Sequence, residues 1–227
     1  MTSAGDAYSE RAAEYIEVLG TMDSVHPDDR ALVAEWSRTL DGRVLDAGCG
    51  PGHWTHFLHG RGVAIEGIDL VPAFIASARE RFPEVPFRVG RLEAIDCAQG
   101  TLAGVLSWYS IIHTPPESIG TVLDEFARCL EPGGSLLLGF FEGQVVEPFA
   151  HAVATAYRWP VEALGDELRA AGFEVVETRE RHDPGTRAHG AIVARRPARD
   201  VSTFVAGGRR EMRADFSRLL SERTDHD

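Results

Sequence analysis

One stretch decides the fold of this chain: Val44-Leu45-Asp46-Ala47-Gly48-Cys49-Gly50-Pro51-Gly52. It reads as a short buried strand, an acidic residue and a glycine-rich turn that runs into a helix. Glycine has no side chain, so its backbone adopts conformations that other residues avoid and lets a ligand approach closely. Such a turn, at the carboxyl end of the first strand, lies where a doubly wound α/β sheet binds its ligand.

The pattern around that stretch alternates between strands and helices. Strands are expected at 43–47, 63–68, 85–89, 102–107, 134–140, 173–179 and 190–195. Helices are expected at 5–19, 27–39, 53–60, 72–82, 117–130 and 161–171. The last two strands are separated by the short loop Asp183-Pro184-Gly185, which predicts antiparallel neighbours. We therefore predict an α/β fold with a doubly wound, seven-stranded, mostly parallel sheet, one antiparallel strand near the C-terminus and two N-terminal cap helices.

Composition narrows the class of partner. The chain has 227 residues, 44% of them hydrophobic, which suits one domain with appendages. Its net charge of −12 argues against nucleic acid and against an acidic membrane surface. The N-terminus has no signal-peptide pattern, and no apolar run approaches the ~20 residues of a membrane span. We expect a cytoplasmic protein, monomer or homodimer, with a small-molecule partner.

Cysteine and histidine do not indicate a metal. Cys49, Cys97 and Cys129 are odd in number and far apart, so neither a disulfide framework nor a zinc spacing follows. His53, His56 and His59 recur every third residue after the glycine turn, which invites a zinc interpretation. Residues spaced by three positions move progressively around a helix, however, and no further metal ligand is evident. We expect no metal site.

The 44–52 stretch resembles the first motif of the class I S-adenosylmethionine-dependent methyltransferases of the small-molecule type, and the resemblance extends over roughly residues 43–196. The dinucleotide fingerprint is the nearest alternative, but it needs a third glycine where His53 stands and typically lacks the acid at Asp46. The resemblance implies that Asp46 supports the methionine end of S-adenosylmethionine. Gly48, Cys49 and Gly50 would pass their backbone beneath it. S-adenosylhomocysteine would be the product.

The resemblance also implies a division of the chain. We expect an N-terminal helical cap at 1–42, a Rossmann-like cofactor-binding core at 43–197 and a tail at 198–227. For the tail two interpretations stay open: a partly disordered segment, or a docked helix or dimer contact.

The ends of the next strands supply further cofactor candidates. Asp69 ends the second strand, where the family holds the ribose hydroxyls through charge-assisted hydrogen bonds, although a helix-capping role is the alternative. Leu70 would then touch the adenine. Arg91 and Leu92 follow the third strand where many relatives carry an acid. Their backbone groups are expected at the adenine edge, with a simple surface loop as the alternative.

Two aromatic residues, Trp108 and Tyr109, end the fourth strand, where the amino-acid end and the sulfonium of the cofactor should pass. Aromatic faces attract cations by ~0.5–2 kcal/mol, while plain core packing is the alternative for either ring.

The predicted reaction is methyl transfer to an O, N, C or S nucleophile of a small metabolite. Alignment supplies ~7–11 kcal/mol of such a barrier, and a base adds ~10²–10⁴-fold in rate. His113 is the first candidate base and His151 the second, with a loop hydrogen bond as the alternative role for His113. Substrate contacts are expected from the cap and from the stretch after the fifth strand: Tyr8, Tyr15, Glu142, Tyr157 and Trp159. For the two cap tyrosines, packing of their helix onto the sheet edge is the alternative.

Two other functions remain open. A module that binds S-adenosylmethionine without transferring methyl would carry the same Asp46 and Asp69. An NAD-dependent oxidoreductase is disfavoured by Asp46 and His53.

Overall fold

The computed structural model describes residues 8, 11, 12, 14, 16 and 21–198. Contacts divide the chain into two units, Met1–Pro197 and Ala198–Asp227. Apart from Ala198 the second unit lies outside the described residues, so the division of the chain and the nature of its tail stay predictions.

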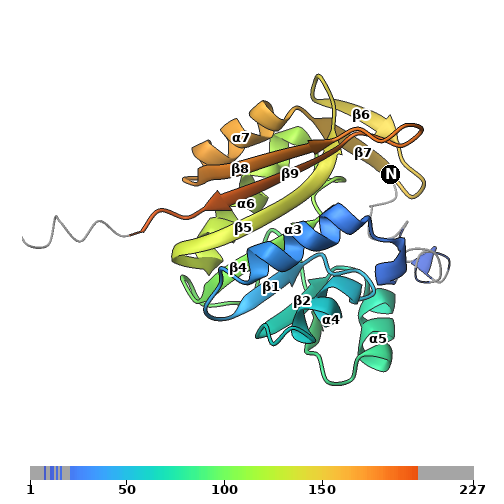
Figure 1. The fold of residues 1–227 in the computed structure, drawn as a ribbon, viewed down its shortest axis with the longest axis vertical. Helices are drawn as coiled ribbons and strands as arrows, with labels where there is room; N and C mark the ends of the chain where they lie inside the picture. The colour runs from blue at the N-terminus through green and yellow to red at the C-terminus, as the bar shows by residue number, and fades with distance from the viewer. Residues whose placement is uncertain (1–7, 9–10, 13, 15, 17–20, 199–227) are drawn as a thin grey trace, which may run out of the picture. The chain divides into compact units, whose positions relative to one another are not determined.

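A mixed β-sheet organises the first unit (Figure 1). The seven predicted strands are β1 (Val44–Ala47), β2 (Ile65–Asp69), β3 (Phe87–Val89), β4 (Leu102–Trp108), β5 (Leu130–Glu142), β8 (Glu174–Arg181) and β9 (His189–Arg195). Strands β3, β2, β1, β4 and β5 lie side by side in that order and run parallel. Strand β9 is antiparallel to β8, as the short loop predicted, and it also runs antiparallel to β5. The α/β fold class is confirmed.

A hairpin that the sequence did not reveal extends the sheet. Strands β6 (Glu147–Ala150) and β7 (Thr155–Trp159) bring the described sheet to nine strands. Strand β7 joins parallel to the end of β5, with Arg158 opposite Phe141, and β6 runs antiparallel to β7. Both strands are short, and Pro148 cannot donate to a ladder, which is tolerated at an edge. Their pairing depends on partners distant in sequence, so local pattern gave no signal.

The helices lie close to their expected positions. They are α3 (Pro27–Ser37), α4 (His53–His59), α5 (Pro72–Arg81), α6 (Ile119–Cys129) and α7 (Val161–Ala170), with short 3₁₀ turns η1 (Met22–Ser24) and η2 (Pro116–Ser118). Helix α3 opens as expected: Pro27 stands in its first turn and Nδ1 of His26 accepts from the Asp28 amide at 3.2 Å. Of the predicted 5–19 helix, residues 8, 12, 14 and 16 are described and helical.

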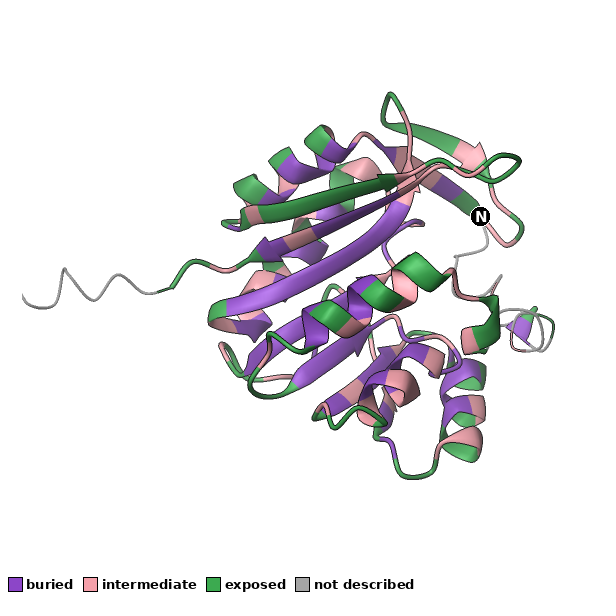
Figure 2. Ribbon diagram, viewed as in Figure 1, coloured by how far each residue is buried: buried purple, intermediate pink, exposed green. Residues whose placement is uncertain are grey.

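The central strands are buried on both faces (Figure 2). Alternate positions pack against α3 and α4: Val44, Leu106 and Leu137. The positions between them pack under α6 and α7: Leu45, Val105 and Leu138. Side chains of a strand alternate between faces, so two helical layers cover one sheet. The loops after β1, β2 and β4 consequently emerge together at the carboxyl edge of the parallel strands.

The N-terminal segment reaches that same edge. Ala12 is buried with Val71 and Phe74 at the start of α5, and Tyr8 and Ile16 pack against them. The ring of Tyr8 meets Phe74 edge-on, with the centroids 5.8 Å apart. This apolar contact holds Tyr8 beside the loops that carry the predicted site.

Candidate active site

Two cavities meet at the carboxyl edge of the sheet. The first, of about 300 Å³, is called here the Asp69 cavity and is also lined by Leu70, Val71, Phe74, Arg91, Leu92 and His113. The second, of about 400 Å³, is called the Asp46 cavity and is also lined by Asp29, His53, Phe141, His151, Arg181, Thr186 and His189. They share five residues: Tyr8, Gly48, Gly50, Trp108 and Tyr109. The glycine turn is therefore common to both.

The glycines of the turn are required for different reasons. Gly48 and Gly50 have φ of 83° and 53°, a region that side chains rarely adopt. A Cβ on Gly48 would lie 2.2 Å from the Cβ of Ser110, so the turn and the loop after β4 close on one another. A Cβ on Gly50 would meet no atom within 4 Å. Because Gly50 lines both cavities, this space is open to a ligand.

The amides of the turn are already used inside the protein. Gly48 and Cys49 both donate to the Ile68 carbonyl at 2.8 Å. Gly50 donates to Oδ2 of Asp69 at 2.9 Å. A dinucleotide fold needs its glycine turn and helix N-terminus to bind a pyrophosphate. This turn presents a bare backbone surface instead, which fits a nucleoside without a pyrophosphate.

Asp69 both shapes the loop and lines its cavity. Besides the Gly50 amide, its carboxylate accepts from the amide of Val71, the N-cap of α5, at 2.8 Å. Burial raises the pKa of Asp69, while the bonds from Val71 and Gly50 oppose that shift. Each carboxylate oxygen has capacity for a further hydrogen bond. The two roles considered for Asp69, capping and ligand binding, are compatible.

Asp46 lies behind the turn. Its side chain is 1% exposed, and Oγ1 of Thr55 in α4 donates to Oδ2 at 2.6 Å. Burial, only partly offset by that bond, raises the pKa of Asp46 to about 7. The Cys49 thiol is buried against Ile75 and Phe87, and burial raises its pKa well above the ordinary value. Cys49 thus offers the site its backbone and no nucleophile.

The predicted adenine-side residues lie together around the Asp69 cavity. Leu70 is 43% exposed there, and Arg91 and Leu92 line the same cavity. Sequence reasoning missed Val71 and Phe74, which complete its apolar wall. Pro72, which opens α5, was the sequence signal that could have found these two residues. Residues around the first turn of a helix lie beside the end of the strand that comes before that helix.

Trp108 and Tyr109 form the boundary between the cavities. Trp108 packs edge-on against Trp54 and Tyr109, with centroids 5.7 Å away in each case. Tyr109 has φ of 57°, a strained value among non-glycine residues, and its hydroxyl is hydrogen-bonded to Nδ1 of His189. Burial raises the pKa of Tyr109, so it stays a neutral phenol. These ring contacts and the hydrogen bond fix the orientation of both aromatic side chains.

The imidazole of His113 has a defined tautomer. Its Nδ1 lies 2.7 Å from the Thr155 carbonyl, which only accepts, so Nδ1 carries the proton. Burial lowers the pKa of His113, and the neutral ring must therefore accept at Nε2. Nε2 accepts from the hydroxyl of Tyr8 at 2.9 Å. The predicted base and a predicted substrate residue thus form one hydrogen-bonded chain.

His151 lies next to this chain. Its ring is 5.3 Å from that of His113 and 5.9 Å from that of Phe141. Burial, with His113 and Arg187 nearby, lowers the pKa of His151 to about 4. Within the described part of the chain its buried Nδ1 has no hydrogen-bond partner. A neutral imidazole with an unused nitrogen therefore lines the Asp46 cavity.

The remaining substrate candidates lie elsewhere. Trp159 is 4% exposed and packs in the core with α7, which corrects the expectation that it lines the pocket. Tyr157 packs against the same core, and Glu142 lies 3.8 Å from Nε2 of His182. Neither of them lines the two cavities. Tyr15 is outside the described residues.

Strands β8 and β9 supply a wall that sequence reasoning missed. The guanidinium of Arg181 pairs with both carboxylate oxygens of Asp29 in α3, one of them at 3.1 Å. His189 stands opposite Phe141 in the sheet and opposite Arg181 in the hairpin. The sequence signal for this wall was the predicted antiparallel pairing of β8 and β9. That pairing places the loop between them at the carboxyl edge of the parallel strands.

The histidines after the glycine turn diverge. His53 lines the Asp46 cavity, whereas His56 stacks on Phe82 and approaches Glu84 at 3.3 Å. Among the described residues no cluster of three or more His, Cys, Asp or Glu side chains is arranged to hold a metal. In the same part of the chain, no helix is long and apolar enough to cross a membrane.

Comparison with known proteins agrees with this geometry. Residues 44–134 match the family described as "Methyltransferase domain". The chain is 31% identical over 106 residues to malonyl-[acyl-carrier protein] O-methyltransferase of Enterobacter lignolyticus, covering 47% of this chain and 41% of the relative. It is 33% identical over 127 residues to trans-aconitate 2-methyltransferase of Methylobacterium nodulans, covering 55% and 47%. The chain thus spans about half the length of the curated relatives it matches.

Solved structures share the fold. The 1,6-didemethyltoxoflavin-N1-methyltransferase of Burkholderia thailandensis, with 1,6-didemethyltoxoflavin and S-adenosylhomocysteine bound, superposes with a TM-score of 0.69 at 21% identity over 84% of this chain and 88% of that one. The [4+2]-cyclase SpnF superposes with a TM-score of 0.72 at 19% identity over 86% and 97%. Residues 44–134 thus carry a methyltransferase domain, and the chain has the fold of the Rossmann-like, S-adenosylmethionine-dependent methyltransferases.

Proposed function

We propose that this protein transfers the methyl group of S-adenosylmethionine to a small-molecule acceptor held in the Asp46 cavity. The observation that carries the proposal is the pair of cavities that share one glycine floor and one aromatic boundary. The bound cofactor supplies a methyl group on a sulfonium whose leaving group is already activated. The residues of the chain then have to bind the cofactor and the acceptor, orient them toward each other, and take a proton from the acceptor.

The Asp69 cavity suits the nucleoside. The Asp69 carboxylate has acceptor capacity for ribose hydroxyls, and charge-assisted bonds of this kind are strong. Leu70, Phe74 and Leu92 give the cavity an apolar wall for a flat base. Gly50 leaves room for the nucleoside, on which any side chain at this position would intrude. The faces of Trp108 and Tyr109 attract a cation at the boundary.

The acceptor side offers two routes for a proton. His113 acts through the hydroxyl of Tyr8, because Nε2 of its ring already accepts from that hydroxyl. His151 offers a buried Nδ1 that has no hydrogen-bond partner among the described residues. Both rings are neutral near pH 7, so either is able to accept a proton. The acceptor atom is O, N, C or S in this proposal.

A small acceptor is favoured over a macromolecule. The walls of the Asp46 cavity come from α3, β5, β9 and the turn, and the chain carries a net charge of −12, which repels nucleic acid. The trans-aconitate enzyme named above also acts, by its name, on a small acidic compound. We further infer a cytoplasmic monomer or homodimer.

Calorimetry tests the proposal first. The full chain should bind S-adenosylhomocysteine and S-adenosylmethionine, and NADH should give no signal. Transfer of radiolabelled methyl to a panel of hydroxy-, amino- and thiol-bearing metabolites follows. Binding of NADH alone would overturn the proposal. Binding of S-adenosylhomocysteine without transfer to any panel member would favour the non-transferring module.

A further inference from the structure

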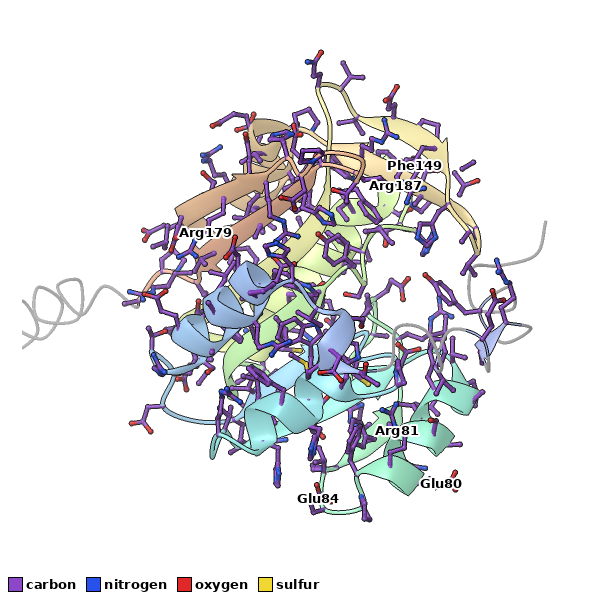
Figure 3. The ribbon with its side chains drawn as sticks, turned by 45° about the vertical axis from the view of Figure 1, so that its right-hand side comes forward. Glu80, Arg81, Glu84, Phe149, Arg179 and Arg187 are labelled. Atoms are coloured by element: carbon purple, nitrogen blue, oxygen red, sulfur yellow. The ribbon has the colours of Figure 1, made fainter. Side chains whose placement is uncertain are left out.

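Two arginines gather around one aromatic ring at the end of the sheet. The guanidinium carbon of Arg158 lies 4.8 Å from the ring centroid of Phe149 in β6, and that of Arg187 lies 5.2 Å from it. Figure 3 shows Arg187 beside Phe149, on the loop that joins β8 to β9. Arg187 also lies 5.7 Å from the centroid of Phe141. Residues of three separate segments thus place two cations together.

This cluster lies at the Asp46 cavity. Phe141 and Thr186, the residue before Arg187, both line that cavity. Arg158 is the direct sheet neighbour of Phe141, so their side chains stand on the same face. Phe149 also meets the ring of His151, another lining residue, at 6.3 Å. The two guanidiniums therefore lie next to residues that line the Asp46 cavity.

The positive charge here is only partly balanced. Arg181 is neutralised by Asp29 and Asp183, at 3.1 and 2.8 Å. Arg158 has one acid, Glu147, at 3.5 Å, in a pair whose side chains are 36% and 49% exposed. For Arg187 no acidic partner occurs among the described residues. Two guanidiniums and one carboxylate leave the cluster with about one net positive charge.

Stacking leaves the hydrogen-bonding capacity of these arginines intact. A guanidinium that lies over a ring uses its face and its charge, while its N–H donors point outward in the plane. Two such groups match the oxygens of a carboxylate, which arginine binds in a fork geometry. About one net positive charge fits a carboxylate monoanion better than a phosphate dianion. The chain as a whole, at −12, would repel an acid, so a local cation pair is needed to bind one.

We propose that Arg187 and Arg158, stacked on Phe149, bind a carboxylate of the methyl acceptor, whose body lies in the Asp46 cavity. The acceptor is then an organic acid, and the aromatic lining from Phe141, Tyr109 and Trp108 favours one with a flat or apolar body. This inference rests on the proposed function, because it assigns the Asp46 cavity to the acceptor.

Paired acids and amides test this inference on the full chain saturated with S-adenosylhomocysteine. The probes are para-hydroxybenzoate, phenylacetate and phenyl phosphate, with the primary amides of the two carboxylic acids. Calorimetry on the wild type should show saturable binding of at least one acid and weaker binding of its amide. Arg187→Gln and the Arg158→Gln, Arg187→Gln double variant should bind that acid roughly 10- to 100-fold more weakly, with amide binding unchanged.

Arg169→Gln is the matched control, because Arg169 lies on α7 and pairs with Asp166 instead. It should keep the acid preference. Arg187→Gln alters an exposed loop, so a folding defect in the double variant would not remove the test.

Three outcomes overturn the inference: equal binding of acid and amide, an acid preference that survives Arg187→Gln, or no binding by any acid. Preference for phenyl phosphate over both acids would overturn the choice of carboxylate. Failure of S-adenosylhomocysteine to bind would instead overturn the proposed function, so the two failures are distinguishable.

Discussion

The hydroxyl of Tyr8 donates a hydrogen bond of 2.9 Å to Nε2 of His113, a residue 105 positions further along the chain. The bond joins the N-terminal segment to the loop after β4. The Thr155 carbonyl fixes the opposite nitrogen as a donor, so β7 orients the pair. Three separate segments thus arrange one path for a proton.

Tyr8→Phe should lower turnover far more than cofactor affinity. The substitution removes the only hydroxyl of the side chain and keeps the ring that packs on Phe74. If the proton leaves through Tyr8, kcat should fall by roughly 10²–10⁴-fold, with S-adenosylhomocysteine affinity unchanged by calorimetry. Tyr157→Phe is the control, since Tyr157 packs against the core. Wild-type turnover in Tyr8→Phe would leave His151 as the base.

The pH dependence of turnover should reflect the lowered pKa of His113. Burial favours the neutral ring, so the base stays active below the usual histidine pKa of ~6.5. We expect kcat to decline only at lower pH, and His113→Gln to lose that acid limb. Nitrogen NMR should show the proton on Nδ1 at neutral pH. A limb at or above the usual pKa would contradict this assignment.

Asp46 should make the fold less stable as pH rises. Its pKa moves from 3.8 to about 7 on folding, so the folded state holds its proton over that interval. The contribution is complete below the unfolded pKa and is lost as pH rises through about 7. Asp46→Asn keeps the neutral form and should be more stable than wild type at pH 8, by on the order of 4 kcal/mol.

Urea titrations from pH 4 to 8 check this, since the difference between the two proteins should open only as pH increases. A constant difference would show that Asp46 is ionised throughout.

Two glycines of one turn should respond differently to alanine. Gly48→Ala places a Cβ 2.2 Å from that of Ser110 and should lower the free energy of unfolding by roughly 2–4 kcal/mol. Ser110→Gly in the same chain removes that clash and should restore part of the loss. Gly50→Ala meets no atom and should cost only about 1–2 kcal/mol of backbone strain, while its methyl group intrudes on the ligand.

Urea unfolding and S-adenosylhomocysteine titration distinguish these two effects. Full cofactor affinity in Gly50→Ala would show that the open space beside Gly50 is not ligand space.

Asp69→Ala should weaken S-adenosylhomocysteine binding by ~1.5–3 kcal/mol, the value of a hydrogen bond to a charged group. It should also loosen the start of α5, because the amides of Gly50 and Val71 lose their acceptor. Glu93→Gln, at the rim of the same cavity, is the control and should bind normally. Unchanged affinity in a folded Asp69→Ala would remove Asp69 from the cofactor site.

Much of the proposed cofactor side was predictable because its residues end consecutive strands. Asp46, Asp69 and Trp108 each stand at the end of an apolar run, and parallel strands bring such ends to one edge. The acceptor side followed no such rule. Trp159 was expected to line the pocket, yet the register of β7 directs its side chain into the core. Arg187 and Phe149 meet only because β9 and the β6–β7 hairpin flank the same strand, β5.

The sequence by itself determined seven of the strands, the glycine turn and the acids near that turn, since hydrophobic periodicity and glycine conformation are local properties of the chain. Only the tertiary structure decided the partners of those groups: Ser110 against Gly48, Tyr8 on His113 and Arg181 on Asp29. Each of these contacts joins residues more than 60 positions apart. No local pattern encodes such pairs, because they depend on which loops the packed sheet brings to its carboxyl edge.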